Sequence, residues 1–334
     1  MLLAACLVRT GRREEGEKLY RQLISEFPHN DGVKTSFVDS LLNIKEFKEA
    51  LSVLEEFSLS MVGSNPWVAG QYGRIYLGLH DYDNAIKAFQ IQIHKYEQAP
   101  SIVYVRLAQS YFRLGERDKA VEIISQGLNV YKDDLAINTL FCANLIYKKS
   151  PPELEEAEKR LNDLANIAPR NGYILQKLVT VGALRGNTQL AIRRIENIHW
   201  KIEPPYLRLP VEITVAIAQK QFSKALEKAD SISSENEYGQ AIIHKIFLIW
   251  ANSELYPERK IHIAKKGLER KIPDFCKRNI PILSMRAQLA RMANDSLQLE
   301  ETIALIRQSN PSVAESILTV SGCDSWEDYD PELS

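Results

Sequence analysis

The feature that most constrains the fold is an apolar pattern that returns every 34 to 37 residues. Its clearest copy has a small residue, an aromatic residue three positions later, a second small residue and a large apolar residue: Ala108, Tyr111, Ala120 and Ile124. A period in this range is typical of a small helical unit stacked many times, because one unit cannot bury its apolar face alone. Stacked units build extended surfaces, which favours a binding scaffold over a catalyst.

The second small residue of each copy is an anchor for aligning the repeats. The anchors are Gly16, Ala50, Ala85, Ala120, Ala157, Ala191 and Ala225. The residues four positions after them are all apolar: Tyr20, Leu54, Phe89, Ile124, Leu161, Ile195 and Ala229. This spacing predicts an amphipathic helix. A second apolar stripe upstream of each anchor predicts a partner helix that packs closely against the first.

Glycine and proline mark the predicted turns. Gly11, Gly115 and Gly186 lie five positions before their anchors, where a helix needs a left-handed C-terminal stop. His80 occupies the same position, so we expect a structural role for it. The segment 150–153 lengthens one inner turn, and its sequence Ser-Pro-Pro-Glu predicts a capping box with proline at the first helical position.

These positions resemble the tetratricopeptide repeat family. Its small, aromatic, small and large apolar positions correspond here to Gly73, Tyr76, Ala85 and Phe89. The resemblance covers roughly residues 1–235 and implies an all-α fold, a right-handed superhelical solenoid of antiparallel helix pairs. Seven units lie in this part, and two diverged pairs over residues 236–310 are expected to cap the solenoid, which gives nine units.

Residues 311–334 are predicted to be an acidic C-terminal tail. After Arg307 there are six acidic residues and no lysine or arginine, whereas the preceding part is mildly basic. One hypothesis is that the tail is a self-ligand, bound near Arg74, Arg106 and Arg113 of its own or a neighbouring chain, which would allow self-association. The alternative is a disordered end or a linker. The short first helix leaves open whether the chain is complete or part of a longer protein.

In this family the first helix of each pair lines a concave face where partners often bind, so the resemblance implies a groove along the first helices. The predicted partner-binding residues on those helices are Trp67, Gln71, Arg74, Arg106, Gln109, Arg113, Tyr147, Tyr173 and Lys177. Arginine, tyrosine and tryptophan carry much of the energy of protein interfaces. An elongated groove of this composition fits an extended peptide or a partner helix. The alternative is an ordinary solvated face.

The predicted function is that of a protein–protein interaction scaffold or adaptor. A first alternative is a regulatory or sensor segment of a larger multidomain protein with an enzyme module elsewhere. A second is an RNA-binding helical-repeat protein, based on the basic run between Lys260 and Arg278. Acidic residues interrupt this run, which favours a solvated helix face and makes nucleic acid a less favoured partner.

No pattern predicts catalysis, a cofactor or a metal site. The six histidines are dispersed, no H-E-x-x-H motif occurs, and the glycines mark turns. Cys142 occupies a packing position and is expected to be inert. The four cysteines lie far apart, which suits a reducing compartment, and no apolar run could span a membrane, so we expect a cytoplasmic protein.

The chaperone-binding members of the family use a clamp of lysine, asparagine and arginine for two carboxylates. The matching positions here include Ala5, Ser36, Asp39 and Trp67. These residues do not form such a clamp, so a chaperone C-terminus is not an expected ligand.

Overall fold

The computed structural model describes residues 1–56, 66–96, 99–197, 201–202, 207–232 and 237–319. Within these ranges the chain is helical and contains no strand, which confirms the predicted all-α helical-repeat fold. None of the described helices is long and apolar enough to cross a membrane. The chain divides into two compact units, unit 1 (residues 1–111) and unit 2 (residues 112–334).

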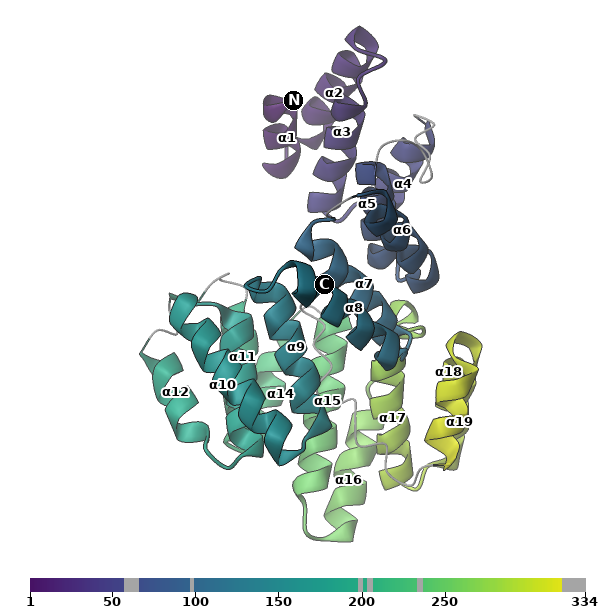
Figure 1. Ribbon diagram of the computed structural model, residues 1–334. Coiled ribbons are helices and arrows are strands. Elements are labelled where there is room, and N and C mark those ends of the chain that lie inside the picture. The colour runs from purple at the N-terminus through teal and green to yellow at the C-terminus, as the bar shows by residue number, and fades with distance from the viewer. Residues whose placement is uncertain (57–65, 97–98, 198–200, 203–206, 233–236, 320–334) are drawn as a thin grey trace. The chain divides into compact units, whose positions relative to one another are not determined.

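Unit 1 is built from antiparallel helix pairs (Figure 1). Its helices are α1 (Leu2–Arg9), α2 (Arg13–Glu26), α3 (Asp31–Asn43), α4 (Phe47–Glu56), α5 (Pro66–Gly78), α6 (Tyr82–Lys95) and most of α7 (Ser101–Arg113). The first helices of successive pairs contact each other, α1 with α3 and α3 with α5. The second helices α2 and α4 also contact the first helix of the next pair, α3 and α5 respectively. First and second helices therefore form two layers.

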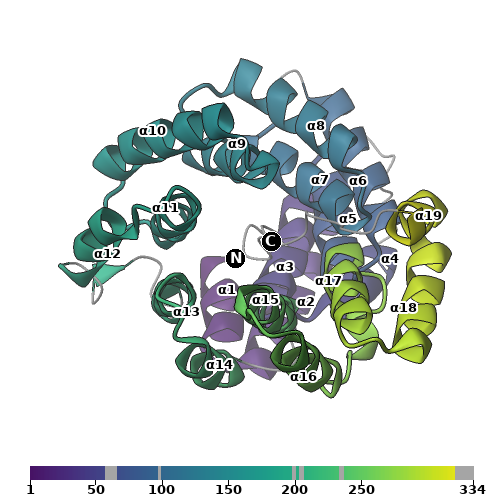
Figure 2. The same ribbon diagram turned by 90° about the horizontal axis from the view of Figure 1, so that it is seen from below.

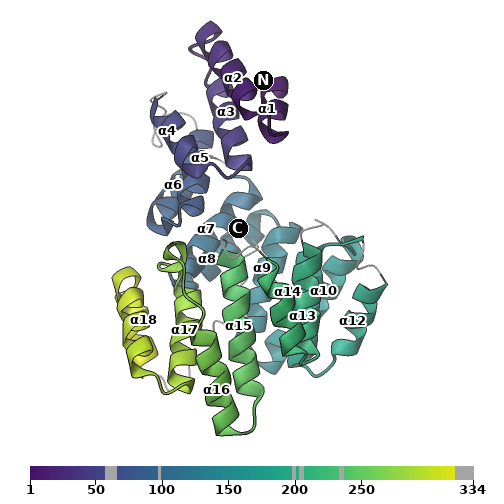
Figure 3. The same ribbon diagram turned by 180° about the vertical axis from the view of Figure 1, so that it is seen from behind.

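Unit 2 continues the same arrangement. Its helices are α8 (Arg117–Val130), α9 (Leu135–Lys148), α10 (Pro151–Ile167), α11 (Gly172–Leu184), α12 (Thr188–Glu196), α13 (Arg208–Ala218), α14 (Phe222–Asp230), α15 (Glu237–Ser253), α16 (Pro257–Leu268), α17 (Ile280–Met292), α18 (Ser296–Ser309) and α19 (Pro311–Thr319). Helices α9, α11, α13, α15 and α17 lie on the inner side of a curved wall, and α10, α12, α14, α16 and α18 on its outer side (Figure 2). Figure 3 shows α13 to α18 from behind.

Small residues set the distance between paired helices. The anchors Ala50, Ala85, Ala120, Ala157 and Ala225 are completely buried. A methyl group added at Gly73 would overlap the ring of Phe89, which comes from the second helix of the same pair. The sequence pattern thus identifies pairs of residues in contact. Ala191 is an exception, because it is only partly buried and lines a cavity of about 380 Å³ beside α12.

The turns follow the prediction at four positions. Gly11, Gly115 and Gly186 have positive φ angles of 84°, 75° and 74°, and His80 has a φ of 60°. The same left-handed stop occurs at Asn294, a residue type that tolerates it, and at three lysines that give no such signal: Lys45, Lys149 and Lys220. Left-handed backbone costs a non-glycine residue about 1–2 kcal/mol, so packing of the flanking helices must fix the turn there.

The predicted capping box at the start of α10 is wrong in part. Pro151 occupies the first helical position as expected. The Ser150 hydroxyl, however, makes no capping hydrogen bond and is buried without a partner among the described residues. The carboxylate of Glu153 lies 3.6 Å from the Lys148 ammonium group, so it pairs with this lysine and does not bond back to the helix start.

Residues 237–309 contain the helix pairs α15–α16 and α17–α18, with Asn294 in the turn of the second pair. Residues 311–319, placed in the predicted tail, form α19, while residues 320–334 lie outside the described part of the chain. The division at residues 235 and 310 stays a prediction.

One side chain joins the two ends of unit 2. The Asn310 amide nitrogen donates a hydrogen bond of 2.6 Å to the carbonyl oxygen of Leu114, which lies 196 positions earlier. The Asn310 amide oxygen accepts the backbone N–H of Val313 and so caps α19. The amide therefore stabilises α19 and connects it to the turn before α8.

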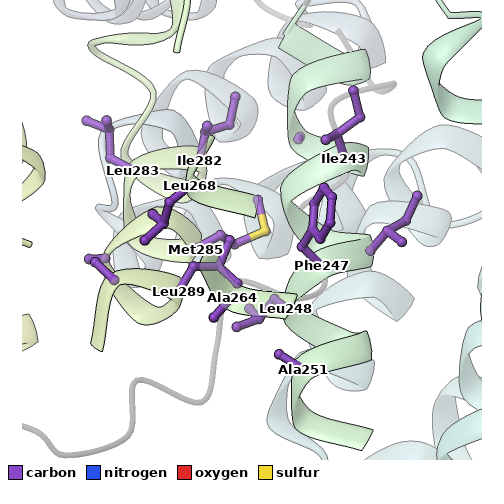
Figure 4. Close-up of a cluster of buried hydrophobic side chains, with 14 of the residues drawn as sticks. Ile243, Phe247, Leu248, Ala251, Ala264, Leu268, Ile282, Leu283, Met285 and Leu289 are labelled. Atoms are coloured by element: carbon purple, nitrogen blue, oxygen red, sulfur yellow. The ribbon is translucent and has the colours of Figure 1, made fainter. Parts of the chain in front are cut away.

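The largest core of unit 2 lies between α15, α16 and α17 (Figure 4). Phe247, Leu268 and Met285 meet there, one from each helix. Arg286 lies beside this core and donates to the carbonyl oxygens of Leu268 and Arg270 at 3.1 and 2.8 Å. It thereby satisfies carbonyl groups at the end of α16 that have no partner within the helix.

His244 is fully buried in the same region. Its Nδ1 is 2.8 Å from the Gln240 carbonyl oxygen, which assigns the proton to Nδ1. Burial, with a smaller contribution from the positive charges of Arg286 and Arg270, lowers the pKa of His244 to about 4, although the hydrogen bond to Gln240 opposes this effect. The folded protein therefore holds this imidazole in its neutral form.

We expect Gly73→Ala to lower the free energy of unfolding by about 1–3 kcal/mol, because the new methyl group collides with Phe89. Urea denaturation measures the change. The double variant Gly73→Ala, Phe89→Leu should lose less than the sum of the two single variants, since the smaller side chain removes the collision. Additive losses would contradict the contact.

We expect Asn310→Asp to cost about 1 kcal/mol, since aspartate keeps the helix cap but cannot donate to the Leu114 carbonyl. Asn310→Ala removes both interactions and should cost more. Hydrogen exchange of the α19 amides separates the two effects. Wild-type exchange and stability in Asn310→Asp would show that the link to Leu114 contributes nothing.

We expect stability to fall between pH 6.5, the ordinary pKa of histidine, and pH 4, because the unfolded chain binds a proton that folded His244 does not. The full loss is at most about 3 kcal/mol. Urea midpoints at pH 7 and pH 4.5 measure it. His244→Gln should flatten this dependence, and an unchanged slope in that variant would assign the loss to other groups.

Candidate partner-binding surfaces

The predicted binding residues belong to both units. Trp67, Gln71, Arg74, Arg106 and Gln109 lie in unit 1, whereas Arg113, Tyr147, Tyr173 and Lys177 lie in unit 2. The two sets are therefore described separately, as one candidate surface on each unit.

Unit 1 contains a cluster of charged side chains on its first helices. Arg74 of α5 forms an ion pair with Asp39 of α3, with 2.5 Å between nitrogen and oxygen. Burial and the nearby charge of Arg74 lower the pKa of Arg106 on α7 to about 10, while Asp39 raises it. Asp39, Arg74 and Arg106 are hereafter called the arginine cluster. In this cluster two positively charged guanidinium groups interact with a single negatively charged carboxylate.

Two buried amides lie on the same helices. The Gln71 amide nitrogen donates to the carbonyl oxygen of Thr35 at 2.7 Å, but its amide oxygen has no hydrogen-bond partner among the described residues. Gln109 is also buried, and neither its amide oxygen nor its amide nitrogen has a hydrogen-bond partner among the described residues. A buried polar atom without a partner costs about 1–3 kcal/mol, so a ligand that bonds to these amides would recover that energy.

Trp67 provides an apolar contact at the start of α5. Its side chain is 58% exposed, and its ring lies edge-on to Tyr96 with 5.9 Å between ring centroids. A large exposed aromatic ring held by a second ring is a suitable anchor for a partner side chain.

The unit 2 surface starts at α8 and α9. The Arg117 guanidinium lies over the Tyr147 ring and donates to the Asn144 amide oxygen at 2.8 Å. On α11, Tyr173 packs against a buried apolar cluster and Lys177 is 6% exposed. Aromatic rings of α9 and α11 and the positive charges of Arg117 and Lys177 therefore occur on α8, α9 and α11.

The expected solvent exposure is wrong for four residues. Gln71, Gln109, Arg113 and Lys177 are each less than 10% exposed, and Arg113 only 2%. Successive first helices crowd together on the inner side, as the bond from Gln71 to Thr35 shows. Arg113 is therefore not a surface residue that can be changed without affecting stability. The role of all nine residues in binding stays a prediction.

Sequence analysis missed Asp39 and Arg117 as members of these surfaces. A signal for Asp39 was present, because Asp39, Arg74 and Gln109 are 35 residues apart and occupy equivalent positions in successive repeats. Arg117 carried no such signal, since it starts a second helix and the predicted groove used first helices only.

The described residues show no group of three or more His, Cys, Asp or Glu side chains that could hold a metal ion. Cys142 is completely buried, and burial raises the pKa of its thiol to about 12. The thiol is therefore protonated at neutral pH and unreactive, as predicted for a packing residue.

Comparison with known proteins supports the repeat assignment. Residues 1–30 and 102–134 match models of the tetratricopeptide repeat. A human IFIT1 dimer with m7Gppp-AAAA is 10% identical, with a TM-score of 0.52 over 95% of this chain and 81% of that chain. A monomeric IFIT1 mutant with Gppp-AAAA is 11% identical, with a TM-score of 0.52 over 92% of this chain and 79% of that chain.

The C-terminal part of a TPR repeat-containing protein from Cytophaga hutchinsonii is 14% identical, with a TM-score of 0.41 over 86% of this chain and 100% of that chain. No curated protein matches the chain. The two matched segments contain the helix pairs α1–α2 and nearly all of α7–α8, with the anchors Gly16 and Ala120. These two segments are therefore tetratricopeptide repeats within an all-α helical-repeat fold.

Proposed function

We propose that this chain is a protein-interaction scaffold whose unit 1 binds an acidic peptide segment of a partner protein. Repeats of this family typically mediate protein interactions. The observation that carries the proposal is the arginine cluster, in which Arg74 and Arg106 share the single carboxylate of Asp39.

The electrostatics of the arginine cluster favour a further carboxylate. The lowered pKa of Arg106 means that burial and the charge of Arg74 make its positive charge costly. A carboxylate from a partner would reduce that cost and could accept paired hydrogen bonds from a guanidinium group. The ligand is therefore an aspartate or glutamate side chain or a chain terminus.

The neighbouring groups favour a peptide over a small anion. The unbonded atoms of Gln71 and Gln109 can pair with the donors and acceptors of a peptide backbone. Exposed Trp67 adds an apolar contact near the start of the same helix as Arg74. An extended segment can use both kinds of contact at once.

This binding chemistry is the same for an independent adaptor and for the sensor segment of a larger protein. RNA is the competing ligand class, since the IFIT1 structures contain RNA. At 10–11% identity they share the fold alone with this chain. RNA is therefore an outcome that the experiment must separate from a peptide.

The test selects phage-displayed random peptides on the immobilised full-length chain and measures their affinities by fluorescence anisotropy. We expect the selected peptides to be rich in aspartate and glutamate. Arg74→Ala should weaken their binding about tenfold, equivalent to about 1.4 kcal/mol. The control is Arg21→Ala, which removes an exposed arginine that pairs with Glu56 between α2 and α4.

Two results would contradict the proposal. One is selection of peptides without acidic residues. The other is equal weakening by Arg74→Ala and Arg21→Ala. A single-stranded oligonucleotide could also bind more tightly than every peptide and lose the same affinity in Arg74→Ala. That result would assign the arginine cluster to the phosphate groups of a nucleic acid.

A further inference from the structure

A cavity of about 380 Å³ lies between α10 and α12 in unit 2, and we call it the α12 cavity. Both helices belong to the outer side of the wall, and α11 lies on its inner side (Figure 2). Leu178 of α11 and Leu190 and Ala191 of α12 form the apolar part of the lining. Leu190 is 66% exposed, so the cavity is open to solvent, and its volume is within the range of natural ligand sites.

The α12 cavity lies where the packing of the repeats is incomplete. The anchors before and after it in the sequence, Ala157 and Ala225, are completely buried, whereas Ala191 is only partly buried. Helix α12 is also short, with 9 residues compared with 17 in α10. The side chain of Leu190 therefore keeps apolar surface in water, and the hydrophobic effect favours a ligand that covers this surface.

The α12 cavity has two positive charges without a carboxylate partner in the described part of the chain. Arg194 donates to neutral amide oxygens, one of them on Asn162 at 3.3 Å, and a guanidinium group has five N–H donors, so some remain for a ligand. Arg193 is exposed and forms no ion pair with a described residue. Glu158, the acidic residue of the lining, already pairs with Arg185 at 2.9 Å. The cavity therefore attracts a carboxylate.

The length of the α12 cavity favours a peptide over a small ion. Its lining includes Asn187, immediately before α12, and Asn197, immediately after it. These positions are about 15 Å apart along the helix axis, a distance that an extended chain covers with about four or five residues. The Asn187 side chain does not cap α12, so its amide can bond to a peptide backbone.

We propose that the α12 cavity binds an extended segment of a partner protein in which an aliphatic side chain stands next to a carboxylate. The aliphatic side chain covers Leu190 and Ala191, and the carboxylate accepts hydrogen bonds from the Arg194 guanidinium. Charge complementarity favours this occupant over a purely apolar one, because a neutral ligand would leave both arginines without a partner of opposite charge. This second site lies on unit 2, whereas the arginine cluster lies on unit 1, so either proposal can fail without the other.

The test depletes a library of phage-displayed random hexapeptides on the full-length Leu190→Glu variant and then selects it on the full-length wild type. Leu190→Glu places a carboxylate at the cavity and leaves the arginine cluster intact, so the depletion removes peptides that bind elsewhere. We expect the surviving peptides to contain an aliphatic residue within about two positions of an aspartate or glutamate.

Fluorescence anisotropy then measures the affinity of a surviving peptide for variants of the chain. Arg194→Gln should weaken its binding about tenfold and Arg193→Gln about threefold. The matched control is Lys159→Gln, which removes an exposed positive charge of α10 outside the cavity. Arg74→Ala should leave the affinity unchanged, which separates this site from the arginine cluster. A peptide with its carboxylates changed to amides should bind wild type and Arg194→Gln equally.

Survival of no peptide, or only of peptides without acidic residues, would overturn the proposal. Losses in Arg193→Gln and Arg194→Gln no larger than in Lys159→Gln would overturn it too. If circular dichroism shows that Arg194→Gln is unfolded, exposed Arg193 decides alone. A second copy of the chain is the alternative occupant. A wild-type dimer in sedimentation velocity that Leu190→Glu abolishes would assign the cavity to that copy.

Discussion

Close packing between a small residue on one helix and a large apolar residue on its partner is the interaction on which the rest of the structure depends. At Gly73 the space for a methyl group is taken by the Phe89 ring, and the anchor alanines other than Ala191 are completely buried. Because small residues recur at this position from pair to pair, equivalent positions of successive first helices come side by side. Asp39 and Arg74 meet for this reason, although neither residue takes part in the apolar packing.

Polar side chains at the contacts between helices are of two kinds. Half-buried Asn310 and buried Arg286 use their donors on carbonyl oxygens of neighbouring elements, so their polarity serves the fold. Gln109, in contrast, is buried with its amide unbonded among the described residues. Burial without compensation costs stability, and a fold that needs only packing would use apolar residues there. This contrast separates structural polar residues from candidates for binding.

Sequence patterns predict features that depend on neighbours within one repeat. The helix pairs, the left-handed turns at Gly11 and His80, and the inert thiol of Cys142 are of this kind. The left-handed turn at Lys45 was missed, because lysine has no local preference for that conformation. The bond between Asn310 and Leu114 could not be predicted, since it depends on curvature accumulated over 196 positions. Burial of residues such as Gln109 was missed for a related reason, because helical spacing does not show how tightly first helices crowd together.

A formal net charge of −1 conceals a separation of charge along the chain. Bases predominate on the inner helices of unit 2, and acids predominate after Arg307. The sum over the whole chain therefore says little about the charge that a partner meets, because the inner helices of unit 2 carry an excess of positive charge that this sum hides.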